Sequence, residues 1–164
     1  MSTDFEGLLE ALNTSGVDFI LVGGLAAIVH GSARATYDVD VVYARSPANI
    51  DRLAGALAPL NPYLRGAPLG LPFRFDADGI RRGLNFTLTT SLGAIDLLGE
   101  ITGGGDYEAL VGDTITVSIF GFDCRCLTLE ALIRVKRAVG RPRDLEAIAE
   151  LEALLEERRR DRSS

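Results

Sequence analysis

One stretch near the start of the chain constrains the fold more than any other: a short apolar run that ends in two glycines. Residues 17–22 are largely apolar and partly β-branched, which is typical of a buried strand. Gly23 and Gly24 end this run, and residues 25–30 then indicate a short helix with Gly31 as its C-cap. Such a turn leaves backbone N–H groups free to meet an anion. Glycines also serve turns alone, so both interpretations stay open.

The remaining pattern of helices and strands predicts one α/β domain with a mixed sheet flanked by helices. The expected helices are 4–14, 25–30, 46–57, 129–139 and 142–159, and the expected strands are 17–22, 38–43, 83–90, 93–98, 114–120 and 122–127. Residues 59–72 are rich in proline and glycine, so we expect an irregular loop there. We therefore expect a single domain over 1–164, with a core at about 4–127 and a C-terminal helical pair at about 128–160.

Composition is that of an ordinary globular protein, with 47% hydrophobic and 24% charged residues among 164. No apolar run approaches the roughly 18 residues that a membrane helix needs, and no signal peptide is visible. We therefore expect a cytoplasmic protein without a membrane partner. The net charge of −6 argues against a broad nucleic-acid surface. Basic residues concentrated within 134–143 still allow a local basic site.

An acidic pair, Asp38 and Asp40, lies in the second expected strand. Residues i and i+2 of a strand share a face, so both carboxylates point the same way while Val39 and Val41 take the other side. Like charges on one face repel unless a cation bridges them, and Mg²⁺ prefers such oxygen ligands. A solvated strand face is the alternative for an isolated pair.

Asp96 strengthens the metal interpretation because it is the only charge in residues 94–98, a run otherwise suited to a buried strand. An ionised carboxylate there is costly unless it is paired or bound to a metal. Three carboxylates from two strands would suit a two-metal site for phosphoryl transfer.

Lys136 lies on the apolar stripe of its helix, in step with Leu129, Leu132 and Ile133. A lysine in this position either extends its amine to solvent or reaches toward negative charge such as a triphosphate. Asp144 begins the last helix, where it would cap the helix dipole or orient Lys136.

Arg34 and Thr36 stand between the glycines and the acidic pair, so we expect both over the same cleft. An arginine there suits phosphate recognition, and an ordinary surface arginine is the alternative. His30 is expected to pack or hydrogen-bond at a helix end. Cys124 and Cys126, with only one histidine in the chain, are too few for a zinc site, so we expect reduced thiols beside the core.

Residues 21–41 together resemble the signature of the DNA polymerase β-like nucleotidyltransferase superfamily. That signature is an apolar residue, Gly-Gly or Gly-Ser, a spacer, and then Asp-x-Asp or Asp-x-Glu. The form seen here, with a His-Gly pair, an arginine and a threonine in the spacer, is most similar to the AbiEii-type toxins of type IV toxin–antitoxin systems. The toxins' downstream lysine and arginine-then-aspartate motif is matched by Lys136, Arg141 and Asp144.

The resemblance implies the nucleotidyltransferase fold and the Mg²⁺- or Mn²⁺-dependent transfer of a nucleoside monophosphate from NTP to an acceptor. It implies metal ligands at Asp38, Asp40 and Asp96, with Lys136 also catalytic. The residues implied to bind nucleotide are Gly23, Gly24, Arg34, Thr36, Lys136, Arg141 and Asp144.

The acceptors implied are tRNA ends in the toxin branch, and proteins or aminoglycosides in other branches. Full-length AbiEii-type toxins carry a longer helical C-terminal part. An antitoxin partner chain or a homodimer is therefore a candidate to complete the acceptor site.

Two other functions stay open from the sequence. One is a non-catalytic nucleotide- or partner-binding module, and the other is a small-molecule nucleotidyltransferase that modifies antibiotics. Clustered, costly charge favours catalysis over a binding module, and the basic residues within 134–143 favour an anionic acceptor such as tRNA over a cationic one.

Overall fold

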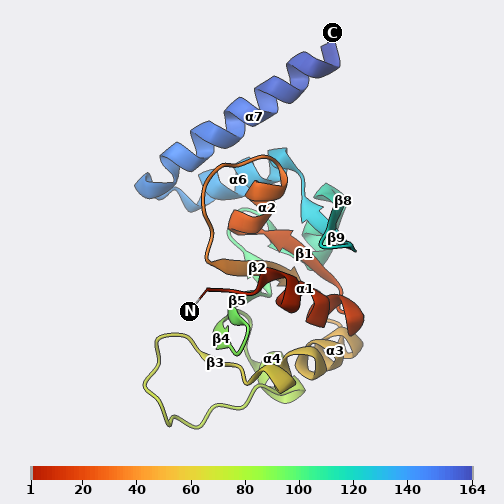
Figure 1. Ribbon diagram of the computed structural model, residues 1–164, viewed down its shortest axis with the longest axis vertical. Coiled ribbons are helices and arrows are strands. Elements are labelled where there is room, and N and C mark those ends of the chain that lie inside the picture. Colours follow the sequence, from red (N-terminus) through yellow and green to blue (C-terminus); the bar gives the residue numbers. More distant parts are fainter. Residues whose placement is uncertain (1, 164) are drawn as a thin grey trace.

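A computed structural model describes residues 2–163 and shows an α/β fold around a mixed sheet (Figure 1). The strands of this sheet are β1 (Phe19–Val22), β2 (Asp38–Tyr43), β3 (Tyr63–Leu64), β4 (Phe86–Thr90), β5 (Gly93–Leu98), β8 (Thr114–Ile119) and β9 (Phe122–Leu127). Their order is β3-β4-β5-β2-β1-β9-β8. β2 pairs antiparallel with β1 and parallel with β5, and β1 pairs parallel with β9. The two strands that carry Asp38, Asp40 and Asp96 are thus neighbours at the centre of the sheet.

The helices lie around this sheet and at one end of it (Figure 1). They are α1 (Phe5–Thr14), α2 (Gly23–Val29), α3 (Pro47–Leu57), α4 (Ala77–Arg82), α5 (Tyr107–Leu110), α6 (Leu129–Val139) and α7 (Leu145–Ser163). Side-chain caps begin several of them: Ser46 accepts from the Asn49 N–H at α3, and Thr128 accepts from the Ala131 N–H at α6. None of the helices described is both long and apolar enough to cross a membrane.

The core takes residues from both faces of the sheet, and α1 and α2 contact β2. Val39 and Val41 of β2 are fully buried on the face opposite the acidic pair. Cys124 and Cys126 of β9 share the face, where their free, buried thiols approach Asn13 of α1 and His30 of α2. The prediction of reduced thiols beside the core is confirmed.

His30 ends α2 and is buried, as the sequence predicted for a packed, hydrogen-bonded residue. Its Nε2 donates to the Leu127 carbonyl at 2.7 Å, which ties α2 to the end of β9. The His30 carbonyl in turn accepts from the Arg158 guanidinium of α7 at 2.9 Å.

Several short elements were not expected from the sequence. Within the loop predicted at 59–72, β3 pairs with β4, and α4 follows it with Asp76 as its N-cap. A small hairpin of β6 (Glu100–Ile101) and β7 (Gly105–Asp106) precedes α5. These pieces are too short for hydrophobic periodicity to appear, so tertiary pairing decides them.

The C-terminal helical pair, α6 and α7, is present, but α7 begins later than the predicted start at residue 142. Gly140 adopts φ +69° and ends α6, and Pro142–Asp144 form a turn of 3-10 helix first. Ala147 and Leu151 bury the first part of α7 against the domain. Further along this single long helix (Figure 1), Leu154 and Leu155 pack against the core and Arg158 contacts the His30 carbonyl.

Candidate metal and nucleotide site

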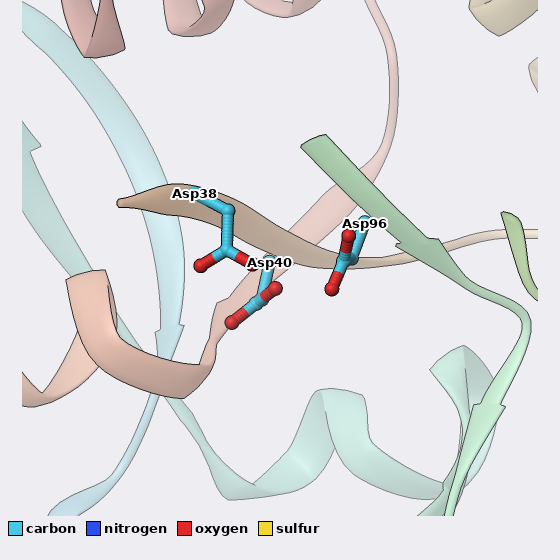
Figure 2. Close-up of side chains that lie close together, drawn as sticks. All are labelled: Asp38, Asp40 and Asp96. Carbon is cyan, nitrogen blue, oxygen red and sulfur yellow. The ribbon is translucent and has the colours of Figure 1, made fainter. Parts of the chain in front are cut away.

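Three carboxylates converge at the centre of the sheet. Asp38 and Asp40 come from β2, and Asp96 comes from β5 as the direct ladder partner of Asp40. One oxygen from each lies within 4.8 Å of the others. Figure 2 shows the three side chains pointing to the same side of the two strands. Parallel pairing in this register is what aligns residues so far apart in the sequence.

The electrostatics of this cluster favour a cation. Burial, together with the neighbouring Asp38 and Asp96 carboxylates, raises the pKa of Asp40 to about 8. Burial also raises the pKa of Asp38, with Asp96 adding to the shift and Arg65 opposing it. Like charges held this close cannot all ionise without compensation. A divalent cation would supply that compensation.

Arg65 is the one cation paired with the cluster among the ion pairs of residues 2–163. Its Nη2 lies 2.8 Å from Asp96 Oδ1, and its Nη1 lies 3.6 Å from Asp38 Oδ2. Nη2 also donates to the Leu88 carbonyl at 2.7 Å. Sequence analysis did not select Arg65, because it lies in the segment expected to be an irregular loop.

The surroundings of Asp96 also fit a divalent cation. Within residues 2–163, Asp96 Oδ1 is buried and has no hydrogen-bond partner, even though a guanidinium nitrogen lies nearby. Carboxylate oxygens are the ligands that Mg²⁺ and Mn²⁺ prefer. A buried carboxylate oxygen without a hydrogen bond is costly unless another positive group completes its environment.

The two glycines allow the acidic cluster to approach the start of α2. Gly23 has φ +67°, a backbone conformation that favours glycine, and a Cβ on Gly23 would overlap the Asp40 carboxylate. A Cβ on Gly24 would overlap the Thr36 hydroxyl, which donates weakly to the Asp38 carbonyl at 3.4 Å. Both glycines are therefore required by neighbouring side chains, in addition to any role toward a phosphate.

A cavity of about 400 Å³ opens over Asp40 and Asp96. Gly23 lies at its edge, and Lys136 and Arg141 line it as cations. The other lining residues are Val22, Asn85, Leu98, Glu100, Ile101, Thr102, Leu127, Leu132, Val135 and Val139. The cavity therefore combines carboxylates, cations and an aliphatic wall in a volume typical of small-ligand sites.

Asp144 holds the two cations of this cavity in place. Its Oδ2 accepts from Arg141 Nε at 2.7 Å, and its Oδ1 lies 3.5 Å from Lys136 Nζ. The Arg141 hydrogen bond lowers the pKa of Asp144, and the Lys136 charge lowers it further. Asp144 contacts Lys136 and also directly precedes α7, so its position is compatible with both roles considered for it. Lys136 keeps 27% of its side chain exposed, so its amine can still meet a ligand.

Arg34 and Thr36 do not line the large cavity in the described part of the chain. Arg34 borders a smaller one of about 160 Å³, together with Gly24 and Lys136, and lies 3.8 Å from Glu146 of α7. Thr36 lies behind the acidic pair, against Gly24. The expectation that both lie over one cleft is therefore wrong for the large cavity, because α7 draws Arg34 to its own side.

The basic residues within 134–143 are largely neutralised by acidic partners. Arg134 pairs with Asp113 at 3.0 Å, and Arg137 pairs with Glu152. Lys136 and Arg141 share Asp144. The cluster is thus less available for a nucleic-acid backbone than its sequence density suggested.

No family model matches this chain, and a search of curated proteins found no matching sequence.

Proposed function

We propose that this chain is a divalent-metal-dependent nucleotidyltransferase with the nucleotidyltransferase fold, transferring a nucleoside monophosphate from NTP to an acceptor. One observation carries the proposal: Asp38, Asp40 and Asp96 meet within 4.8 Å on neighbouring central strands, and Asp40 and Asp96 line a cavity that Lys136 and Arg141 also line. Carboxylates for a metal and cations for phosphate are the two groups that this chemistry needs.

The acidic and the basic residues of the site would have different roles. Asp38, Asp40 and Asp96 would hold Mg²⁺ or Mn²⁺, which when bound would neutralise phosphate charge and lower the pKa of the attacking hydroxyl. Lys136 and Arg141, fixed by Asp144, would bind the triphosphate from the opposite wall.

The proposed transfer forms one bond at the α-phosphorus and breaks another. The acceptor oxygen forms a bond to the α-phosphorus, and the bond from that phosphorus to pyrophosphate breaks. The acceptor proton passes to one of the three carboxylates. The aliphatic wall that includes Leu98, Leu132 and Val135 would cover the less polar part of the nucleotide.

The acceptor stays a prediction from the resemblance. A tRNA end or a protein, in a toxin-like component of a toxin–antitoxin system, is what that resemblance implies. The neutralised basic cluster gives no added support to tRNA.

The test of the proposal is nucleotidyl transfer by the purified chain. Each α-labelled NTP is incubated with the protein, Mg²⁺, and one of three acceptors (total tRNA, cell lysate or an aminoglycoside), beside an Asp38→Ala/Asp40→Ala double variant. Label should pass to an acceptor with the wild type and not with the double variant. Bound NTP without any label transfer would support the binding-module alternative, and labelled aminoglycoside would support the small-molecule alternative.

A further inference from the structure

Arg65 is attached at both ends to the sheet that carries the acidic cluster. Directly after β3, its backbone N–H donates to the Thr87 carbonyl of β4 at 3.0 Å, and its Nη2 donates to the Leu88 carbonyl at 2.7 Å. Its side chain is 31% exposed, about as covered as that of Asp38. The guanidinium is therefore held at the edge of the site rather than extended into solvent.

The Arg65 guanidinium lies beside Asp38 and Asp96. It approaches Asp96 Oδ1 at 2.8 Å and Asp38 Oδ2 at 3.6 Å, and no ion pair joins it to Asp40 in the described chain. It adds one positive charge against three carboxylates, so the cluster remains short of compensation. Its place is beside two of the three oxygens that would bind a divalent ion.

The contact is not the paired, bidentate arrangement of a settled arginine–carboxylate bridge. In the described residues, Arg65 Nε and Asp96 Oδ1 are both buried without a hydrogen-bond partner. The guanidinium divides its donors between two carboxylates and a backbone carbonyl. A guanidinium bound in this way neutralises charge but leaves carboxylate oxygens without a full set of hydrogen bonds. A divalent cation can therefore displace it from these oxygens.

We propose that Arg65 is an internal counter-ion that competes with the divalent cation for Asp38 and Asp96. This inference rests on the proposed metal-dependent function. Arg65 stabilises the three carboxylates together before metal enters, and it lowers their affinity for free metal ions. Loading of the site is then favoured when a triphosphate brings further negative charge. A purely supporting arginine would do the opposite, because its removal would disorder the ligands and weaken metal binding.

The test measures Mn²⁺ affinity directly, by the paramagnetic resonance signal of free Mn²⁺ during titration. Arg65→Gln and Arg65→Met remove the charge, and the second keeps an apolar stem of similar length. Both should bind Mn²⁺ at least about tenfold more tightly than the wild type, since a unit charge a few ångströms away is worth more than 1.4 kcal/mol at low effective dielectric. Arg65→Lys should remain close to the wild type.

Arg82→Gln is the matched control. It removes the same charge from an exposed ion pair with Asp78, so it corrects for the change in net charge alone. Its Mn²⁺ affinity should equal that of the wild type. Circular dichroism establishes that each variant is folded, and either neutral Arg65 variant is sufficient for the comparison.

The outcomes separate this inference from the function on which it rests. If the wild type binds Mn²⁺ and folded Arg65→Gln or Arg65→Met binds no more tightly, competition is wrong and the metal site stands. If neither the wild type nor the variants bind Mn²⁺ at millimolar concentration, the metal site itself is wrong, and the inference is overturned with it.

Discussion

Asp40 and Asp96 are direct partners in the parallel ladder between β2 and β5, so their carboxylates leave the sheet side by side. With Asp38 two residues earlier on the same face, the backbone itself determines the spacing of the three acids. Side-chain flexibility contributes little, because the ladder fixes the positions of the Cβ atoms. Four predictions test what this arrangement and its surroundings do.

Asp40→Asn should make the protein more stable and unable to bind metal. Burial and two neighbouring carboxylates raise the pKa of Asp40 to about 8, so the native state carries an unfavourable acid that asparagine relieves. We expect about 0.5–2 kcal/mol greater free energy of unfolding at pH 7 without metal, a typical gain at strained functional sites. Urea denaturation is measured without Mn²⁺ and with Mn²⁺ at about 100 times its Kd. The metal should raise the free energy of unfolding by about 2.7 kcal/mol in the wild type and should not raise it in the variant. An equal effect of Mn²⁺ on both proteins would contradict the assignment of Asp40.

Gly23→Ala should damage the site and not only the backbone. Gly23 has φ +67°, and its new methyl group would meet the Asp40 carboxylate. Gly121→Ala is the control, because Gly121 has φ +82° but no atom near its Cβ position. Each variant should lose about 1 kcal/mol from the positive φ, and Gly23→Ala should lose about 1–3 kcal/mol more from overpacking. Only Gly23→Ala should weaken Mn²⁺ binding; equal losses in the two variants would show that the approach of Asp40 is unimportant.

Asp144→Asn should release the two cations of the large cavity. The side chain of Asp144 is only 9% exposed, and it pairs with both Arg141 and Lys136. Loss of its charge should cost about 1–3 kcal/mol of stability and weaken ATP binding in a calorimetric titration. Glu152→Gln removes an exposed partner of Arg137 on the same helix pair and should cost less than about 1 kcal/mol, with ATP binding unchanged. Unchanged ATP affinity in Asp144→Asn would remove Asp144 from the proposed site.

Stability should fall in mildly acidic solution because of His30. Burial lowers the pKa of His30 below 6.5, with Arg158 contributing, while the Leu127 carbonyl and Glu130 oppose the shift; the Cys126 thiol lies beside the ring. The unfolded chain therefore takes up a proton at higher pH than the folded chain does. The stabilisation is complete above pH 6.5 and is lost as the pH falls through the native pKa.

His30→Gln is the comparison for this pH effect, since glutamine can donate to the same carbonyl without titrating. Between pH 7.5 and 5.5 the wild type should lose about 1 kcal/mol more than the variant in urea denaturation. Parallel losses in the two proteins would show that His30 does not titrate differently on folding.

The sequence predicted the parts of this molecule that have local signals. Strand periodicity placed Asp38 and Asp40 on one face, and the helices predicted at 46–57 and 129–139 correspond to α3 and α6. The mixed α/β sheet with a long C-terminal helix is confirmed. That Asp96 would be the direct partner of Asp40 was beyond local pattern, since ladder register between distant strands is a tertiary property.

Arg65 and Arg34 show the limit of such reasoning from opposite sides. Arg65 lies in a proline- and glycine-rich segment and directly follows the two-residue strand β3, so nothing local linked it to the acids. Arg34 lies beside the acidic pair in sequence, yet it pairs with Glu146 of α7. Arg34 is close to the acidic pair in sequence but forms its ion pair elsewhere, whereas Arg65 is distant in sequence and pairs with the acids. The partner of a long charged side chain depends on which opposite charge the fold brings near it.

The parallel pairing of β2 with β5 also bears on how the molecule assembles. A parallel ladder needs a crossover, and here the connection runs through α3, β3, α4 and β4 before β5 returns beside β2. Closing so long a segment is slow compared with forming a hairpin. The three acids can meet only after that closure, so recovery of Mn²⁺ binding during refolding would time this long-range pairing, separately from the return of helical signal.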